Sequence, residues 1–340
     1  MFMAIDMHAH WLPEEFCDAL RARSAPPFIR RKDDGHEYLE SSFNSSPLTA
    51  RETPEQRIAE MDSNGVERGV LSLTTVYGVE RLPSAESVPL CRAFNNAVAA
   101  ACAKYPDRFS GLAALPVADM NETLAEFDRI MALPGMVGAL LPGDGFLSIK
   151  RAEKFRPFFE AADKAGAILL VHYGKIADDA DGPKVDASDN GHSRVGTLDM
   201  QARISSNMIT FCMTDFLKPY ANVSVLLHNL GGNIPYEIDR LDHRSMLDRP
   251  QDELPSKRIR ESRVLVDCNS LGAKPIELAV DCYGASRIVF GSDGTDFGMN
   301  WTQKAIAEAR ISDADKEAIL FGNALRALAR VQRPRAAAAE

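Results

Sequence analysis

The chain has 340 residues, of which 45% are hydrophobic and 26% charged, so its composition excludes intrinsic disorder and predicts a large core. A formal net charge of −9 argues against nucleic acid as a partner, because phosphate binding needs a basic surface. No apolar run is long enough to span a membrane, and the first residues lack the features of a secretory signal. We therefore expect a cytoplasmic protein without a membrane or nucleic-acid partner.

The cysteines support the same compartment. No two of them form a CxxC pair, and each lies within an apolar segment. Such thiols are typical of reduced core residues in an intracellular protein, and a catalytic thiol is the alternative. The six are Cys17, Cys91, Cys102, Cys212, Cys268 and Cys282.

Short aliphatic and β-branched runs alternate with helical patterns along nearly the whole chain. The runs are continuous, as in parallel strands that are buried on both faces. Eight such strand–helix units predict a closed (β/α)8 TIM barrel of the α/β class, distorted by insertions. The alternative is an open doubly wound sheet, which normally has a glycine-rich phosphate turn after its first strand; this chain has none there. The expected strands are 3–7, 69–73, 111–115, 137–141, 167–171, 223–227, 264–266 and 287–290.

The clearest helix is expected at 119–133. Asp119 can cap it, Glu122 follows three residues later as in a capping box, and Pro134 ends it. Apolar residues between these points fall on one helical face. Similar patterns predict helices at 54–64, 86–105, 154–165, 198–219, 274–282 and 313–329.

We expect one domain over residues 1–332, followed by a disordered tail at 333–340. Two insertions, at about 24–53 and 174–196, follow the first and fifth strands. In a barrel these loops rise over the active-site face, so they either shape a pocket or form variable surface loops.

The first strand ends in Asp6-Met7-His8-Ala9-His10. Because side chains alternate along a strand, His8 and His10 point the same way, about 7 Å apart. Two neutral imidazoles on one wall form half of a metal site, whereas the alternative is a surface histidine pair.

Three more polar residues each follow a predicted strand: His172 the fifth, His228 the sixth and Asp293 the eighth. The carboxyl ends of barrel strands converge on the axis, where barrel active sites lie. The fourth strand ends at Pro142 and offers no Lys or Glu that could bridge two metals. A single metal is therefore expected.

These motifs resemble the amidohydrolase superfamily, and within it the branch of aminocarboxymuconate semialdehyde decarboxylase and related aromatic-acid decarboxylases, hydrolases and hydratases. The resemblance covers residues 3–330. It rests on 5–10, 170–172, 230–235, 287–293 and the closing Gly-Asn-Ala at 322–324.

The resemblance implies that His8, His10, His172 and Asp293 hold one divalent metal, zinc first and manganese second. It also implies a lyase or hydrolase that acts on a small carboxylated aromatic or ring-cleavage product, with Asp293 exchanging protons. Hydrolysis of a C–C, lactone or amide bond, or hydration, is the alternative to decarboxylation. A non-catalytic metal-binding barrel and a phosphotriesterase-like binuclear hydrolase are the other classes considered.

The chain departs from the family pattern after the sixth strand. The family usually has His-x-Gly-Gly there, whereas this chain has His228-Asn229-Leu230-Gly231-Gly232. One residue reverses the face of a strand. Either a bulge returns His228 to the site, or Asn229 takes a purely hydrogen-bonding role, since an amide cannot shuttle a proton. Both are kept as candidate catalytic residues.

Three residues are candidate substrate ligands: Tyr173, His192 and Arg240. Arg240 matches a helix arginine that in some relatives reaches the substrate carboxylate of a neighbouring subunit, which implies a homodimer; a surface ion pair is the alternative. Gly294 replaces the first residue of an aromatic-Pro pair common in relatives, so the resemblance does not transfer a substrate.

Overall fold

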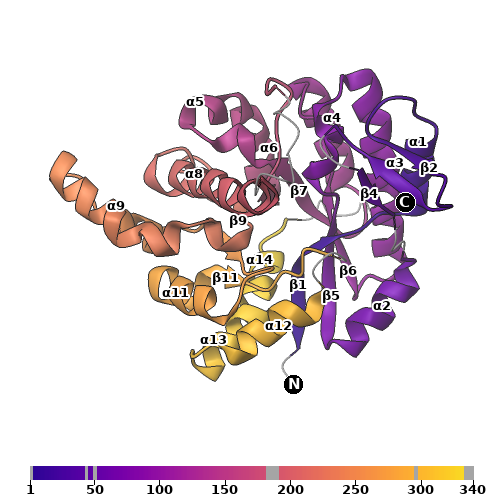
Figure 1. Cartoon of the computed structure of the whole chain (residues 1–340). Coiled ribbons are helices and arrows are strands. Elements are labelled where there is room, and N and C mark those ends of the chain that lie inside the picture. The colour runs from indigo at the N-terminus through magenta and orange to yellow at the C-terminus, as the bar shows by residue number, and fades with distance from the viewer. Residues whose placement is uncertain (1–2, 43–44, 49–51, 181–190, 295–297, 333–340) are drawn as a thin grey trace, which may run out of the picture.

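A computed structural model describes residues 3–42, 45–48, 52–180, 191–294 and 298–332. Eight parallel strands form one sheet in sequence order, with helices around it (Figure 1). The first and last strands adjoin, since Met7 N donates to Phe290 O at 3.0 Å and Asp293 N to His8 O at 2.8 Å. The predicted (β/α)8 barrel is thus confirmed. Its strands are β1 (Ala4–His10), β5 (Val66–Ser72), β6 (Phe109–Ala113), β7 (Met136–Pro142), β8 (Ile168–His172), β9 (Ser224–Leu227), β10 (Leu265–Asp267) and β11 (Ile288–Val289).

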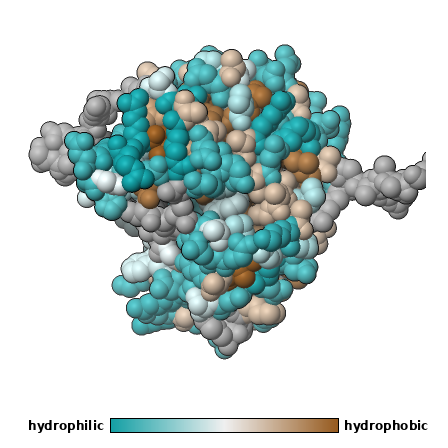
Figure 2. Space-filling model, turned by 90° about the vertical axis from the view of Figure 1, so that its right-hand side faces the viewer, coloured by the Kyte–Doolittle hydropathy of each residue, from teal (hydrophilic) through white to brown (hydrophobic). Residues whose placement is uncertain are grey.

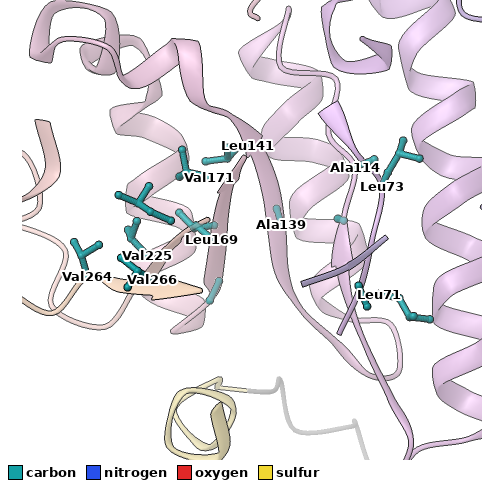
Figure 3. Packing of buried hydrophobic residues seen from close by; sticks show 14 of the residues in the cluster. Leu71, Leu73, Ala114, Ala139, Leu141, Leu169, Val171, Val225, Val264 and Val266 are labelled. Carbon is teal, nitrogen blue, oxygen red and sulfur yellow. The ribbon is translucent and has the colours of Figure 1, made fainter. Parts of the chain in front are cut away.

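Two apolar layers alternate along the strands. Ile168 and Leu170 face the barrel interior, whereas Leu169 and Val171 pack toward the helices (Figure 3). His172 is next in the interior series and ends β8. Alternation of side chains therefore carries it to the mouth of the barrel.

A β-bulge in β1 changes which of its side chains face the barrel interior. Asp6 pairs with Gly69 of β5 and Ala9 with Leu71, so the stretch of β1 between them holds one residue more than its partner. Such an insertion reverses which side chains face inward. Ile5 is an interior residue before the bulge, and His10 lines the cavity after it.

The helices largely follow the sequence pattern. Asp119 caps α4 and accepts from the N–H groups of Asn121 and Glu122. The helix expected at 198–219 ends earlier, at Met213, because Thr214 is extended. The bounds are α1 (Glu14–Arg21), α2 (Pro54–Ser63), α3 (Ser84–Lys104), α4 (Met120–Met131), α5 (Ile149–Ala152), α6 (Arg156–Ala165), α7 (Gly191–Ser193), α8 (Met200–Met213), α9 (Ile234–Asp248), α10 (Pro255–Glu261), α11 (Ala273–Tyr283), α12 (Met299–Glu308), α13 (Asp313–Glu317) and α14 (Asn323–Ala329).

The first insertion forms a second, antiparallel sheet of β2 (Phe28–Arg31), β3 (Glu37–Glu40) and β4 (Ser45–Pro47). Part of the second insertion, 181–190, and the expected tail at 333–340 lie outside the described residues. Among the described helices, none has both the length and the apolar character to cross a membrane. The face shown in Figure 2 is mainly hydrophilic, with hydrophobic residues in small separate groups.

Candidate metal centre

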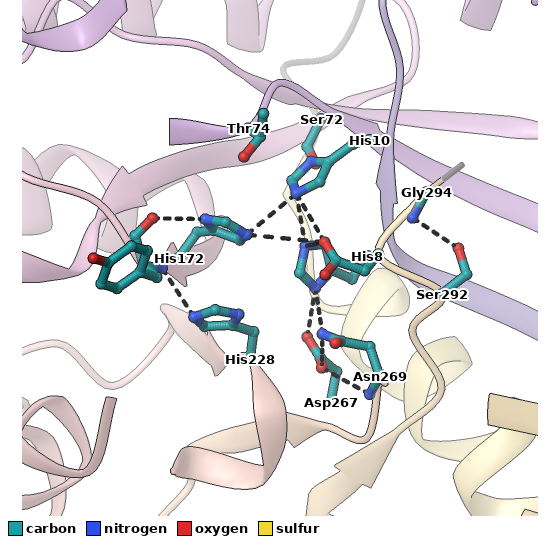
Figure 4. A network of polar contacts seen from close by, with 12 residues as sticks. His8, His10, Ser72, Thr74, His172, His228, Asp267, Asn269, Ser292 and Gly294 are labelled. Carbon is teal, nitrogen blue, oxygen red and sulfur yellow. Dashed lines mark hydrogen bonds and ion pairs between the residues drawn. The ribbon is translucent and has the colours of Figure 1, made fainter. Parts of the chain in front are cut away.

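Four side chains converge at the carboxyl ends of the barrel strands: His8, His10, His172 and Asp293. One ligand atom from each lies within 4.8 Å of all the others. The Nε2 atoms of His8 and His10 are 3.1 Å apart, and those of His10 and His172 are 3.2 Å apart. Asp293 Oδ1 is 3.3 Å from His8 Nε2 and 3.2 Å from His10 Nε2. Figure 4 shows how the three histidines turn toward one another.

These separations match a shared ion. Ligand atoms 2.0–2.1 Å from a tetrahedral metal are about 3.3 Å from one another. Three imidazole nitrogens with one carboxylate oxygen form a donor set for a first-row divalent metal. The Asp293–His172 separation of 4.0 Å is the longest that involves the carboxylate. The cluster therefore has the ligand types and the spacing that a divalent metal requires.

The Nδ1 atom of each imidazole faces away from the cluster and has its own partner. His10 Nδ1 is 3.1 Å from Ser72 Oγ, and His172 Nδ1 is 2.9 Å from both Thr75 Oγ1 and the Tyr173 carbonyl. His8 Nδ1 is 2.9 Å from a carboxylate oxygen of Asp267. A proton on each Nδ1 leaves the Nε2 lone pair for the metal.

The fourth ligand depends on an unusual backbone. Asp293 has φ 62°, and its position is held by Asp6, which accepts from Ser292 N at 3.0 Å and from Ser292 Oγ at 2.5 Å. Burial raises the pKa of Asp6 to about 6 despite these bonds. Gly294 follows with φ 76°, and a Cβ there would lie 2.8 Å from the backbone N and O of His10.

Charge is unevenly distributed in the cluster. Burial lowers the pKa of His8, but the carboxylates of Asp267 and Asp293 outweigh it and raise that pKa to about 9. Burial alone would raise the pKa of Asp293, yet His8 and His10 hold it below its ordinary value. Burial keeps the pKa of His172 well below its usual range. The cluster without metal thus carries a carboxylate among histidines of different basicity.

Both His228 and Asn229 are buried beside the metal centre and line the same cavity. The His228 ring stacks on that of His172, and its Nε2 accepts from the Tyr173 backbone N–H at 2.9 Å. Burial lowers the pKa of His228 to about 4. After the strand, Asn229 and Leu230 take φ 50° and 52°. This left-handed turn brings two successive residues to one cavity, which regular alternation would forbid.

The cavity above the cluster has a volume of about 510 Å³. Tyr173 lines it, as expected of a substrate ligand. Arg240 is exposed on α9 outside the lining, and His192 lies in α7, its side chain outside the description. The first insertion does reach the cavity. The lining is His10, Trp11, Leu12, Leu39, Ser46, Pro47, Leu48, Glu52, Arg57, Thr74, Val76, Tyr77, His172, Tyr173, Gly196, Met200, His228, Asn229, Ser270 and Asp293.

Arg57 of α2 lines the cavity and is a charged residue that the sequence analysis did not single out. Its side chain is 2% exposed, and its Nε is 2.8 Å from a carboxylate oxygen of Glu52. Its Nη2 donates to the His10 carbonyl at 2.9 Å, and its Nη1 has no hydrogen-bond partner among the described residues. A buried guanidinium beside a metal ligand is suited to receiving an anionic oxygen.

Comparison with known proteins agrees with this geometry. The amidohydrolase family model matches residues 5–330. The chain belongs to the amidohydrolase family. The match includes all four residues of the cluster and both His228 and Asn229.

Family members of known activity resemble the chain over most of its length. A gamma-resorcylate decarboxylase from Polaromonas sp. strain JS666 is 25% identical, over 79% of this chain and 85% of that protein. A 2-keto-4-carboxy-3-hexenedioate hydratase from Sphingobium sp. is 23% identical, over 97% of each chain.

Solved structures share the fold. A dihydroxybenzoic acid decarboxylase from Polaromonas sp. JS666, with bound manganese and 2-nitroresorcinol, gives a TM-score of 0.70 at 20% identity, covering 97% of each chain. A 5-carboxyvanillate decarboxylase from Novosphingobium aromaticivorans, with manganese and a nitrobenzoic acid, gives 0.73 at 20% identity, covering 96% of each chain. The barrel fold of this chain is therefore shared with decarboxylases whose structures hold manganese.

Proposed function

We propose that this amidohydrolase is a metal-dependent decarboxylase of a small carboxylated aromatic or a ring-cleavage product. The observation that carries the proposal is a cluster of three histidines and one aspartate at the floor of a cavity with aromatic walls. Trp11, Tyr77 and Tyr173 form those walls and offer flat apolar surfaces to a ring. The decarboxylases among the relatives support the same reaction.

For the metal we propose zinc, because three imidazoles and one carboxylate suit it. Manganese is the alternative, supported by the two structural relatives that hold it. When bound, the metal supplies a Lewis acid that polarises an oxygen of the substrate. His8, His10, His172 and Asp293 would hold it.

Arg57 is proposed to bind the substrate. Its Nη1 has no hydrogen-bond partner among the described residues, and Arg57 is one of the residues that line the cavity. An anionic oxygen there would gain a charge-assisted hydrogen bond. Glu52, which pairs with the same guanidinium, disfavours a second anionic group on this wall.

Decarboxylation breaks the bond between the ring carbon and the carboxyl carbon. The electron pair stays on the ring carbon, carbon dioxide leaves, and one proton, supplied in net from solvent, takes its place. Asp293 is proposed to deliver that proton from Oδ2, because its contacts with the histidines use Oδ1. His228 stays neutral and, with Nε2 occupied, presents an Nδ1–H donor.

Hydration is the second candidate, because the hydratase relative matches 97% of the chain. The two reactions differ in what they consume and release. Purified enzyme should be supplied with hydroxybenzoates, lactones and muconate-type acids carrying a ¹³C-labelled carboxyl group. Decarboxylation predicts labelled carbon dioxide equal to the substrate lost, with Asp293→Ala as the inactive control. Substrate loss with the label retained in an adduct of water would establish the alternative.

We further propose a homodimer that forms through α9. This helix projects from the barrel (Figure 1), and its Tyr236, Met246 and Leu247 side chains are 81%, 52% and 62% exposed. Apolar groups this exposed are suited to an interface. Arg240 on the same helix would then reach the partner's cavity. Sedimentation equilibrium should give twice the chain mass, and Tyr236→Asp should give a monomer; a monomeric parent would refute the dimer.

A reducing, cytoplasmic environment is proposed as well. All six cysteines are thiols, and all are buried. Thiol titration of the protein prepared from cytosol should give no titratable thiol when folded and six when unfolded.

A further inference from the structure

Asp267 lies next to the candidate metal centre but is not one of the four residues of its cluster. It ends β10, and its side chain is fully buried. Its Oδ2 lies 2.9 Å from Nδ1 of His8, on the side of the ring opposite the Nε2 that faces His10 (Figure 4). The residue therefore contacts a ligand without contacting the cavity.

The hydrogen-bond partner of His8 Nδ1 is chemically different from the partners of His10 Nδ1 and His172 Nδ1. His10 is backed by the Ser72 hydroxyl, and His172 by the Thr75 hydroxyl and a carbonyl. Behind His8 lies the Asp267 carboxylate instead, with the Asn269 amide nitrogen, which donates to Asp267 Oδ1, 3.1 Å from the same Nδ1. A carboxylate fixes the Nδ1–H tautomer, orients the ring and strengthens the opposite nitrogen as a donor to metal.

The second oxygen of Asp267 binds a different segment. Oδ1 accepts from Asn229 N at 3.1 Å, from Asn269 N at 3.2 Å and from Asn269 Nδ2 at 2.7 Å. With donors on both oxygens, the buried carboxylate is stabilised where it stands. It joins His8 to the left-handed turn that begins at Asn229.

The packing leaves the pair little room to move. A Cβ on Gly291 would lie 2.9 Å from His8 Cβ and 3.2–3.3 Å from Cβ and Cγ of Asp267. Gly291 thus lets the segment after β11 approach both residues at once. Hydrogen bonds on one side and close packing on the other give the contact a single arrangement.

We propose that Asp267 is a positioning residue, which holds His8 for the metal and ties it to the turn at Asn229. The proposal rests on the metal site of the proposed function but needs neither a substrate nor a reaction. It therefore fails or succeeds separately from decarboxylation.

The test is Mn²⁺ binding to metal-free enzyme, measured by titration calorimetry for the parent, Asp267→Asn and Ser72→Ala. Asp267→Asn keeps size and most hydrogen bonds but removes the charge, so Mn²⁺ affinity should fall by about 10- to 100-fold. Ser72→Ala is the matched control, since it removes the neutral partner of His10. Its Mn²⁺ affinity should fall less than that of Asp267→Asn. An affinity of Asp267→Asn within twofold of the parent, or an equal loss in Ser72→Ala, would overturn the proposal.

A measurement on the parent keeps the proposal testable if the variant does not fold. In ¹⁵N-histidine-labelled, zinc-loaded enzyme, the Nδ1–H proton of His8 should resonate downfield of those of His10 and His172. A carboxylate acceptor polarises the N–H bond more than a hydroxyl or carbonyl does. A His8 signal at or upfield of the other two would overturn the assignment.

Discussion

The imidazole of His228 lies nearly flat on that of His172, with ring centroids 4.4 Å apart and 24° between the planes. The His172 ring belongs to the candidate metal cluster, and the His228 ring is fixed by the Tyr173 backbone N–H. Their contact places His228 beside the metal centre although the sequence sets it one residue out of register.

Changing His228 should therefore reduce turnover without removing the metal. His228→Gln keeps an acceptor for the Tyr173 amide but loses the ring, and kcat should fall by about 100-fold. In Asn229→Ala, kcat should fall by less than about tenfold, because the structure holds Asn229 through its backbone N–H, which the variant keeps. Steady-state kinetics and metal analysis check both variants. A larger loss in Asn229→Ala would assign the role to the amide instead.

Gly294 should be intolerant of any side chain. Gly294→Ala brings a Cβ to 2.8 Å from the backbone of His10 at a φ of 76°, so Asp293 and His10 must shift. We expect Mn²⁺ affinity to fall by at least about tenfold, as when ligand geometry is disturbed. Gly272→Ala is the matched control, since nothing lies within 4 Å of its added Cβ and its φ is −88°. Equal Mn²⁺ affinities in the two variants would contradict this.

Glu80 should make folding stability depend on pH. Burial raises the pKa of Glu80 from 4.5 to about 8, and its Oε1 has no hydrogen-bond partner among the described residues. Between those values the folded state keeps a proton that the unfolded state has lost, so the free energy of unfolding falls as pH rises. The slope is about 1.4 kcal/mol per pH unit at most.

Glu80→Gln should remove that slope. Urea unfolding from pH 4.5 to 9 should show a variant that is more stable than the parent at pH 8–9, with the difference shrinking toward pH 4.5. A pH-independent difference would mean that Glu80 is charged when folded.

Arg57 should govern substrate affinity. Arg57→Gln removes the guanidinium but not the metal, so KM should rise by about 10- to 100-fold, the range for a charge-assisted hydrogen bond. Glu52→Gln removes the competing carboxylate and should not raise KM for a monocarboxylate. Metal content must remain that of the parent, because Arg57 also donates to the His10 carbonyl. An unchanged KM would leave Arg57 a structural residue.

The barrel could be predicted because its strands are continuous apolar runs between clear helical patterns. The ligand histidines could be predicted because they end such runs. The bulge in β1 was not visible, since the placement of two residues of β1 opposite one residue of β5 is a property of strand pairing and not of local sequence. The sheet of the first insertion was not predicted either, because its strands have only 3 or 4 residues, too few for a clear alternating pattern.

The residues that support the site were missed for a different reason. Ser72 lies 62 positions from His10, and Asp267 lies 259 positions from His8. Ser72 ends β5 and Asp267 ends β10, as His10 and His172 end their strands, and that shared placement was the available signal. The positive φ of Asn229 and Leu230 gave no signal, because neither residue is a glycine.

The central claim is a single divalent metal held by His8, His10, His172 and Asp293. Elemental analysis of purified enzyme and of His10→Ala, both dialysed to remove loose metal, tests it most directly. We expect one equivalent of zinc or manganese per parent chain and much less than one equivalent of metal per chain of His10→Ala. A metal-free parent with full activity, or a His10→Ala variant that still holds one equivalent, would contradict it.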